Sequence, residues 1–258
     1  QQFPKGKYLL PAYYYQADCY YRQKEFEKAL EKYQYVIDIP GNAFLEQSLR
    51  NISRILFGKK QYEKALQYYQ RMVDLFDNEN TLLEAGIGIM RSYYNLHEYG
   101  KAVEATKKVL QIDELSDIMA REARYILGKS YVALQQWEDA IKPFDILAME
   151  VKSKQGAEAK YRIAEIYFKQ EKYKQAENEV VEFIDMHTPH EYWMAKAFIL
   201  WADIFVIRDD EFQAVHTLYS LIDNYEHKED GIIASAKKRI RQIKQKEKQQ
   251  NKELQKEE

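Results

Sequence analysis

The sequence predicts an all-α protein, a right-handed superhelix (α-solenoid) of about six helix-turn-helix hairpins with a C-terminal capping helix. Glycine and proline are scarce, at 9 and 5 of 258 residues, which favours helices over a turn-rich β protein. Hydrophobic residues make up 46% of the chain, enough for a packed core. A pattern of small and aromatic residues at helical spacing recurs six times, and stacked hairpins of this kind form a superhelix.

The pattern is clearest in the stretch Tyr125–Leu147. Small and large residues alternate there at distances of three and four, which lets two antiparallel helices pack closely on either side of a short polar turn. From the small residue to the last aromatic, the pattern reads Gly128, Tyr131, Trp137, Ala140 and Phe144. We therefore interpret this stretch as one helical hairpin.

The elements follow in order along the chain. Residues 1–9 contain a Pro-x-Gly break and begin with Gln1 rather than Met, so we expect them to end a preceding repeat of a longer protein. The array itself covers residues 10–236. The pattern residues of its six hairpins span Ala17–Val36, Ser53–Met72, Met90–Val109, Gly128–Leu147, Ala164–Phe183 and Asp203–Ile222.

The spacing of the second helices identifies a true repeat. A small residue recurs at intervals of 36, 37, 38, 36 and 39 residues, and each copy has an aromatic residue three positions earlier. The positions are Ala29, Ala65, Ala102, Ala140, Ala176 and, with valine in place of alanine, Val215. A random helical sequence would not keep this arrangement six times.

The last segment, residues 237–258, is a charged helical tail. It has 9 Lys and Arg against 4 Glu, a net charge of +5. Since the whole chain has a net charge of −2, the remaining residues carry −7. Ile240 and Ile243 can cover the open end of the last hairpin, as terminal repeats require.

The pattern resembles the tetratricopeptide repeat, a helix-turn-helix unit of about 34 residues. That repeat has a small residue at its eighth position, Tyr at its eleventh, Ala at its twentieth and an aromatic at its twenty-fourth. Gly128, Tyr131, Ala140 and Phe144 match these positions, whereas the sixth hairpin departs from them at Asp203, Val206 and Val215. The resemblance covers about residues 10–230.

A narrower resemblance rests on long linkers and many aromatic residues. Breaks at residues 38–41 and 187–190 lengthen the repeat, and the chain has 22 tyrosines. In these respects it is similar to the envelope-associated tetratricopeptide proteins of Gram-negative bacteria, of the outer-membrane assembly lipoprotein and Tol-Pal-associated types. This resemblance implies a bacterial periplasm or cell envelope location, with the cytoplasm as the alternative.

The resemblance also implies a binding surface, because ligands of tetratricopeptide proteins usually contact the first helices on the concave side. The corresponding residues are Tyr14, Tyr21, Arg50, Arg54, Phe57, Arg91, Tyr94, Tyr125, Lys129, Tyr161, Glu165 and Phe168. Rings alternating with charges would suit a peptide or a partner helix. In the alternative interpretation, Glu122 and Glu158 pair with Arg91 and Lys129 of neighbouring repeats, and the rings fill the superhelix.

We expect no catalysis, cofactor or metal. His187 and His190 have a metal-like spacing but flank Pro189 in a linker, and the set of four ligands that a closed zinc site uses is missing. The net charge of −2 gives no indication of nucleic acid binding, and no run of about 18 apolar residues suits membrane insertion. The expected partner is a protein or peptide. A structural spacer or self-associating (homo-oligomeric) module is the alternative function.

Three residues make local predictions. The single cysteine, Cys19, lies in the first predicted hairpin, where we expect a buried thiol. Gly86 and Gly88 should each cost about 1 kcal/mol of helix stability relative to Ala. Either close packing of a neighbouring helix or a groove floor exposed to a ligand would account for these glycines.

Overall fold

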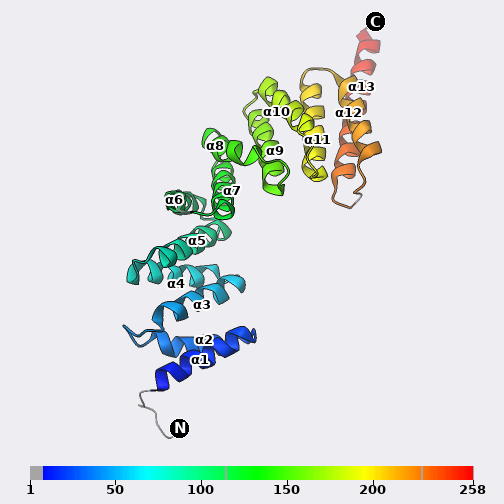
Figure 1. Ribbon diagram of the computed structural model, residues 1–258. Helices are drawn as coiled ribbons and strands as arrows, with labels where there is room; N and C mark the ends of the chain where they lie inside the picture. The colour runs from blue at the N-terminus through cyan, green and yellow to red at the C-terminus, as the bar shows by residue number, and fades with distance from the viewer. Residues whose placement is uncertain (1–7, 114, 228, 258) are drawn as a thin grey trace. The chain divides into compact units, whose positions relative to one another are not determined.

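The computed structural model describes residues 8–113, 115–227 and 229–257, with side chains to residue 250, and these residues form thirteen α-helices and no strand (Figure 1). The chain divides into two compact units, Gln1–Gln136 and Trp137–Glu258. Unit 1 holds α1 (Leu9–Arg22), α2 (Phe26–Ile37), α3 (Leu45–Gly58), α4 (Tyr62–Leu75), α5 (Glu79–Asn95), α6 (Tyr99–Val109) and α7 (Asp117–Ala133). Unit 2 holds α8 (Trp137–Ala148), α9 (Lys154–Lys169), α10 (Tyr173–Asp185), α11 (Glu191–Ile207), α12 (Glu211–Asn224) and α13 (Ile232–Glu257).

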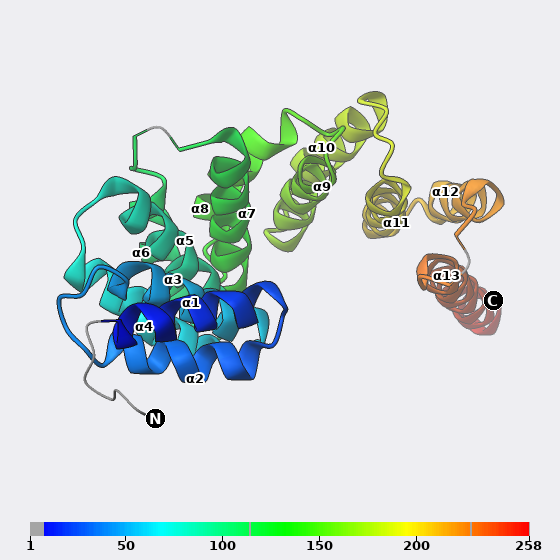
Figure 2. The same cartoon turned by 60° about the horizontal axis from the view of Figure 1, so that its bottom comes forward.

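The helices of unit 1 pack as the predicted hairpins. Helices α1 and α2, α3 and α4, and α5 and α6 are antiparallel pairs, each of which packs on the next (Figures 1 and 2). Ala29, Ala65 and Ala102 are fully buried, as the repeat requires, because their small side chains let the helices of a pair approach. Tyr33, Tyr69 and Met72 fill the same core, so the predicted all-helical fold is confirmed.

Each hairpin turns through one residue in the left-handed conformation. The φ angle is positive at Lys24, Lys60, His97, Gln135, Glu171 and Asp209, with values between 55° and 61°. The next backbone N–H donates to a carbonyl five residues earlier, as Gln61 does to Leu56 at 2.9 Å. This is a Schellman motif, which satisfies the last carbonyls of the first helix. It uses a non-glycine residue in a conformation that favours glycine.

Aromatic pairs cover these turns. In four hairpins the first residue of the second helix is aromatic, and its ring meets a ring at the end of the first helix. The pairs are Tyr21–Phe26, Phe57–Tyr62, Tyr94–Tyr99 and Phe168–Tyr173, with ring centroids 5.2 to 6.1 Å apart. The recurring aromatic in the sequence therefore has a structural role at the turn.

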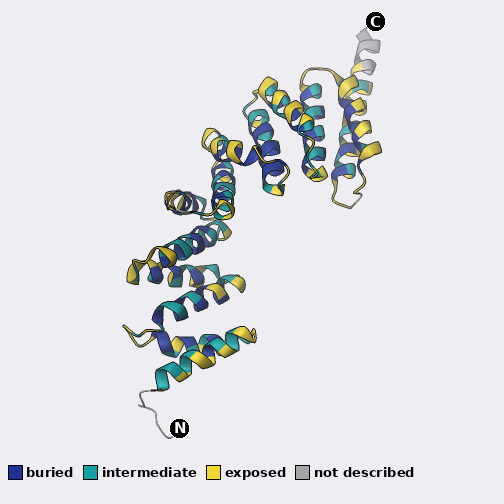
Figure 3. Ribbon diagram, in the orientation of Figure 1, coloured by how far each residue is buried: buried dark blue, intermediate teal, exposed yellow. Residues whose placement is uncertain are grey.

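Helix α13 closes unit 2 by packing on α11 and α12. Ile240 and Ile243 are buried, at 6% and 5% exposure, which confirms their predicted capping role. The helix begins at Ile232, before residue 237 where the predicted tail starts, because Ile232 and Ala236 extend the same buried stripe. Figure 3 shows this buried side of α13 together with the exposed turns of the hairpins.

Two local predictions have different outcomes. The prediction for Cys19 is wrong, because its side chain is exposed. Cys19 follows the buried Ala17 by two residues, which is a rotation of about 200° around the helix. At Gly88, a side-chain carbon would overlap the ring of Tyr69, so close packing accounts for this glycine. The predicted end of a preceding repeat falls mostly on residues 1–7, which lie outside the described residues.

Candidate binding faces of the two units

The predicted binding residues lie on the first helices of the hairpins. In unit 1, Tyr14 and Tyr21 lie on α1, Arg50, Arg54 and Phe57 on α3, Arg91 and Tyr94 on α5, and Tyr125 and Lys129 on α7. None of these nine residues is buried. In unit 2, Tyr161, Glu165 and Phe168 lie on α9, and Tyr161 is buried at 5% exposure. We call these two sets the first-helix faces.

Arginine side chains on the first-helix face of unit 1 join consecutive repeats. Arg54 Nε lies 2.6 Å from Oε1 of Glu84, so α3 is tied to α5. Arg91 Nε donates to Oε1 of Glu122 at 2.6 Å and its Nη2 donates to Oε2 at 2.5 Å, so α5 is tied to α7. This hydrogen bonding raises the pKa of Arg91. The predicted pairing of Arg91 with Glu122 is confirmed, and these cations already have carboxylate partners.

The buried ring of Tyr69 lies close to the ion pairs of Arg54 and Arg91. Its ring is 5% exposed and lies against Gly88. Burial raises the pKa of Tyr69 to about 12, and Glu84 adds to the effect. The phenol is therefore a neutral group at physiological pH, close to the charges of Arg54 and Arg91.

The rings of α1 also have partners within unit 1. Tyr14 stacks on Phe44 with centroids 4.5 Å apart. The ring of Tyr33 lies 6.2 Å from that of Tyr14, and its hydroxyl accepts a hydrogen bond of 2.7 Å from the buried amide of Asn51. These contacts fix the ring positions on this part of the face.

The first-helix face of unit 2 forms a groove of about 470 Å³. Its walls come from α9, α11 and the N-terminal part of α13, and all three predicted residues of α9 line it. We call it the unit 2 groove. The groove is also lined by Lys169, Tyr192, Lys196, Asp203 and Arg239.

Charges of both signs are held in place around this groove. Tyr161 donates to Glu165 at 3.0 Å, and Arg162 Nη1 donates to the other oxygen of Glu165 at 2.7 Å. Arg239 makes a bidentate pair with Asp203, at 2.7 and 2.9 Å. This pair explains why the sixth repeat has Asp203 at its small position, since Arg239 of α13 occupies the adjoining space.

Lys196 of α11 lies close to aromatic rings at this groove. Lys196 Nζ lies 4.9 Å from the ring centre of Tyr161 and 5.5 Å from that of Trp193, within the range of cation–π attraction. Tyr192 is 40% exposed beside them.

The sequence interpretation missed Lys196 and Arg239. One signal could have found Arg239, because it follows Asp203 by 36 residues, the interval of the repeat. Helix α13 thus takes the place of a seventh first helix.

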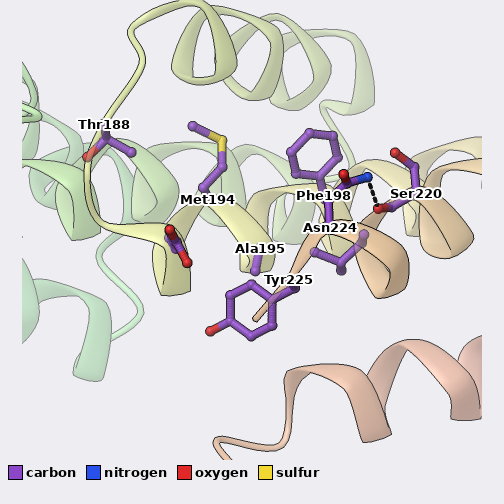
Figure 4. Close-up of a pocket in the computed structure, with 9 residues that line it drawn as sticks. Thr188, Met194, Ala195, Phe198, Ser220, Asn224 and Tyr225 are labelled. Carbon is purple, nitrogen blue, oxygen red and sulfur yellow. Dashed lines mark hydrogen bonds between the residues drawn. The ribbon is translucent and has the colours of Figure 1, made fainter. Parts of the chain in front are cut away.

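A second hollow of about 350 Å³ lies between α11 and α12 (Figure 4). Met194, Ala195, Phe198, Leu221 and Tyr225 give it an apolar lining. The Asn224 amide donates to the Ser220 carbonyl at 2.8 Å at its edge. None of the predicted binding residues lines this hollow.

The two linker histidines make backbone contacts. A ring nitrogen of His190 lies 3.0 Å from the carbonyl oxygen of Lys152, and Lys152 Nζ donates to the carbonyl of His187 at 2.8 Å. Within the described residues, no group of three or more His, Cys, Asp or Glu side chains is arranged to hold a metal ion. No helix among the same residues has the length and apolar character needed to span a membrane.

Family and structural comparisons agree with this architecture. Models described as tetratricopeptide repeat match residues 11–39, 47–78 and 125–182. No curated protein matches the sequence.

Several solved structures share the fold at low sequence identity. The C-terminal part of a tetratricopeptide repeat-containing protein from Cytophaga hutchinsonii is similar with a TM-score of 0.68 and 19% identity, covering 90% of this chain and 89% of that one. YrrB, described as a TPR protein with an unusual peptide-binding site, gives 0.57 and 19%, covering 81% and 100%. MamA gives 0.58 and 18%, covering 72% and 98%. Because three models of the family match and the hairpins repeat along the chain, the protein belongs to the tetratricopeptide repeat family.

Proposed function

We propose that this protein is a non-catalytic scaffold that binds a peptide or a partner helix on its first-helix faces. Tetratricopeptide repeats are protein-interaction scaffolds, and peptide binding by YrrB agrees with this role. The observation that carries the proposal is the unit 2 groove. Its volume of about 470 Å³ lies in the range of ligand sites, and it combines rings with charges of both signs.

The two faces support binding to different degrees. In unit 1 the guanidinium groups of Arg54 and Arg91 are engaged by glutamates, and Tyr14 is stacked. In unit 2 the exposed ring of Tyr192 borders an open groove, and Lys169 is 46% exposed there with a long contact of 4.0 Å to Glu165. We therefore place the principal anchor for a partner in unit 2, where a side chain can pack on Tyr192 and a carboxylate can reach Lys169.

Paired variants test this site. The immobilised protein is exposed to bacterial envelope and cytosolic extracts beside Tyr192→Ala, Lys169→Gln and the control Tyr219→Ala. Tyr219 has the same exposure as Tyr192, 43% against 40%, but lies on α12 outside the groove. We expect the wild type and the control to capture a protein that both groove variants lose. Equal capture by all four would contradict the proposal.

Charge reversal of Arg54 and Arg91 would be a poor test. A glutamate at either position would face Glu84 or Glu122 and lose the bond between repeats. Any loss of capture would then combine a binding effect with a folding effect.

A structural spacer or self-association module is the second candidate. The ties from Arg54 to Glu84 and from Arg91 to Glu122 join three consecutive first helices, which favours a stiff unit 1. Sedimentation equilibrium over a hundredfold concentration range separates the candidates. A monomer that captures a partner supports the scaffold, whereas a concentration-dependent mass without capture supports self-association.

We also propose a bacterial cell envelope location, based on the long linkers and the aromatic richness of the sequence. Fractionation of the native cells with an antibody against the array tests it. Recovery in the cytosol would contradict this location.

A further inference from the structure

A large groove lies on another side of unit 1, between the second helices α4 and α6. Its floor is α5, and its volume is about 570 Å³. The side chains that make it apolar are Val73 of α4, Leu82 and Ile89 of α5, and Ala105, Val109 and Ile112 on and after α6. We call it the α4–α6 groove, and none of the predicted first-helix residues lines it.

The same space one repeat earlier is closed by side chains. There, Leu49 is fully buried on α3, a helix that packs on both α2 and α4. Tyr68 of α4 donates from its hydroxyl to Gln34 of α2 at 3.2 Å, and Arg71 donates to the carbonyl of Ile37 at 2.9 Å.

A shift of 37 residues leads from this closed interval to the open one. Gly86 stands at the place of Leu49, and Ala105 stands at the place of Tyr68. Two large side chains are thus missing, and the groove lies where they would pack. The floor and walls are otherwise similar, since Ile52 corresponds to Ile89.

Packing does not require glycine at residue 86 as it does at residue 88. A side-chain carbon at Gly86 would lie 3.3 Å from Cγ2 of Val109, a tight contact that a small shift relieves, whereas one at Gly88 would overlap the Tyr69 ring. A helical glycine costs about 1 kcal/mol relative to Ala. Gly86 therefore lowers helix stability at a position that serves to keep the groove open.

The dimensions and walls of the groove favour a helix as its occupant. Its floor residues Leu82, Gly86, Ile89 and Tyr93 follow one stripe of α5, and eleven residues of rise give about 16 Å, or three helical turns. The walls are helices, whose backbone N–H and C=O groups are already hydrogen-bonded within each helix. They therefore have no free backbone groups with which an extended strand could pair. A helix satisfies its own backbone and can place an apolar stripe against the floor.

The rims carry opposite charges. Asp74 lies on the α4 side and Lys108 on the α6 side, and neither makes an ion pair within the described residues. Two other charged lining residues of the α6 side are already paired, Lys101 with Glu98 at 2.5 Å and Glu104 with Lys107 at 3.7 Å. A helix with a cation on one flank of its apolar stripe and a carboxylate on the other would complement Asp74 and Lys108.

We propose that the α4–α6 groove binds an amphipathic helix of about three turns from a partner protein, with its cationic flank toward Asp74 and its anionic flank toward Lys108. The site is separate from the unit 2 groove, so either one can fail without the other.

A synthetic peptide tests the proposal. The probe is an amidated peptide of about 14 residues with leucines at helical spacing, lysines on one flank and glutamates on the other. Fluorescence anisotropy measures its affinity for the full chain. The variants are Ala105→Tyr alone, Gly86→Leu with Ala105→Tyr, which copies the preceding repeat, and the control Ala234→Tyr at an exposed site of α13. We expect both groove variants to weaken binding at least tenfold and the control to bind like the wild type.

A charge exchange tests the orientation. Asp74→Lys with Lys108→Glu should prefer a second peptide in which the lysine and glutamate flanks are interchanged. Circular dichroism checks that each variant is folded. If Gly86→Leu with Ala105→Tyr fails to fold, Ala105→Tyr alone still tests binding in the groove.

Three results would overturn the proposal. They are no binding of the peptide at about 1 mM, equal binding by the groove variants, and binding without any preference for flank order. A fourth result would overturn it as well, namely a wild-type dimer that Ala105→Tyr dissociates, because the occupant would then be a second copy of this chain.

Discussion

Two glycines separated by a single residue should respond to alanine in opposite directions. Gly86 and Gly88 both lie in α5, so each alanine gains up to about 1 kcal/mol of helix stability. At Gly86 the new methyl group meets only Val109 at 3.3 Å, and a small shift relieves the contact. Gly86→Ala should therefore raise the stability of unit 1 by about 0.5 kcal/mol.

At Gly88 the methyl group would overlap the ring of Tyr69, which is fixed in the core at 5% exposure. Overpacking of this kind costs about 1 to 3 kcal/mol and outweighs the gain in helix stability. Gly88→Ala should therefore lower the stability of unit 1, by up to about 2 kcal/mol once the helix gain is subtracted.

Urea unfolding followed by circular dichroism measures both effects, and the first transition should be used because repeat arrays need not unfold in one step. The double variant Gly88→Ala with Tyr69→Leu completes the test. Removing the ring should make the alanine nearly harmless, so the two changes are strongly coupled. If Gly88→Ala is as well tolerated as Gly86→Ala, the packing argument is refuted.

Three further predictions concern turns and charges. Lys60→Gly should raise stability by about 0.5 to 1 kcal/mol and Lys60→Ala should not, because only glycine relieves the left-handed turn; thermal melts distinguish them. Arg91→Met should lower the urea midpoint by an amount equivalent to about 1 kcal/mol or less, since Arg91 and Glu122 are 40% and 30% exposed, and the difference should shrink in 1 M NaCl; a salt-independent loss would contradict this. Burial by itself would raise the pKa of Glu165, but pairing with Arg162 outweighs burial and leaves the pKa below its ordinary value near 4.5. The stability from Glu165 is thus present above pH 4.5 and is lost as the pH falls through the lowered pKa, so Glu165→Gln should flatten acid unfolding of unit 2 below pH 4.5.

Much of the fold could be predicted because small and aromatic residues recur at a nearly constant interval along the sequence. Ala29, Ala65, Ala102, Ala140 and Ala176 are all fully buried, and a helix of 3.6 residues per turn places each of them against its partner helix. The turns could be located from the aromatic residue that follows them. The prediction for Cys19 is wrong because its position on the helix, away from the buried Ala17, decides its exposure more than its residue type does.

The binding faces were less predictable. The first helices give the face, but they do not reveal that Arg54 and Arg91 bond to the next repeat, since a cation beside a carboxylate suits either a ligand or a neighbour. The contribution of Arg239 depends on α13 packing where another first helix would lie. The α4–α6 groove depends on differences between repeats, and a comparison of Leu49 with Gly86 could have indicated it.

Photo-crosslinking tests the scaffold function most directly. A photoreactive phenylalanine analogue replaces Tyr192 in the unit 2 groove or, as the control, Tyr219 on α12, and the cells are irradiated. Because a bound peptide or helix would pack on the exposed ring of Tyr192, we predict a discrete crosslinked partner from residue 192 and none from residue 219. No crosslink from residue 192, or the same products from both positions, would contradict partner binding in this groove.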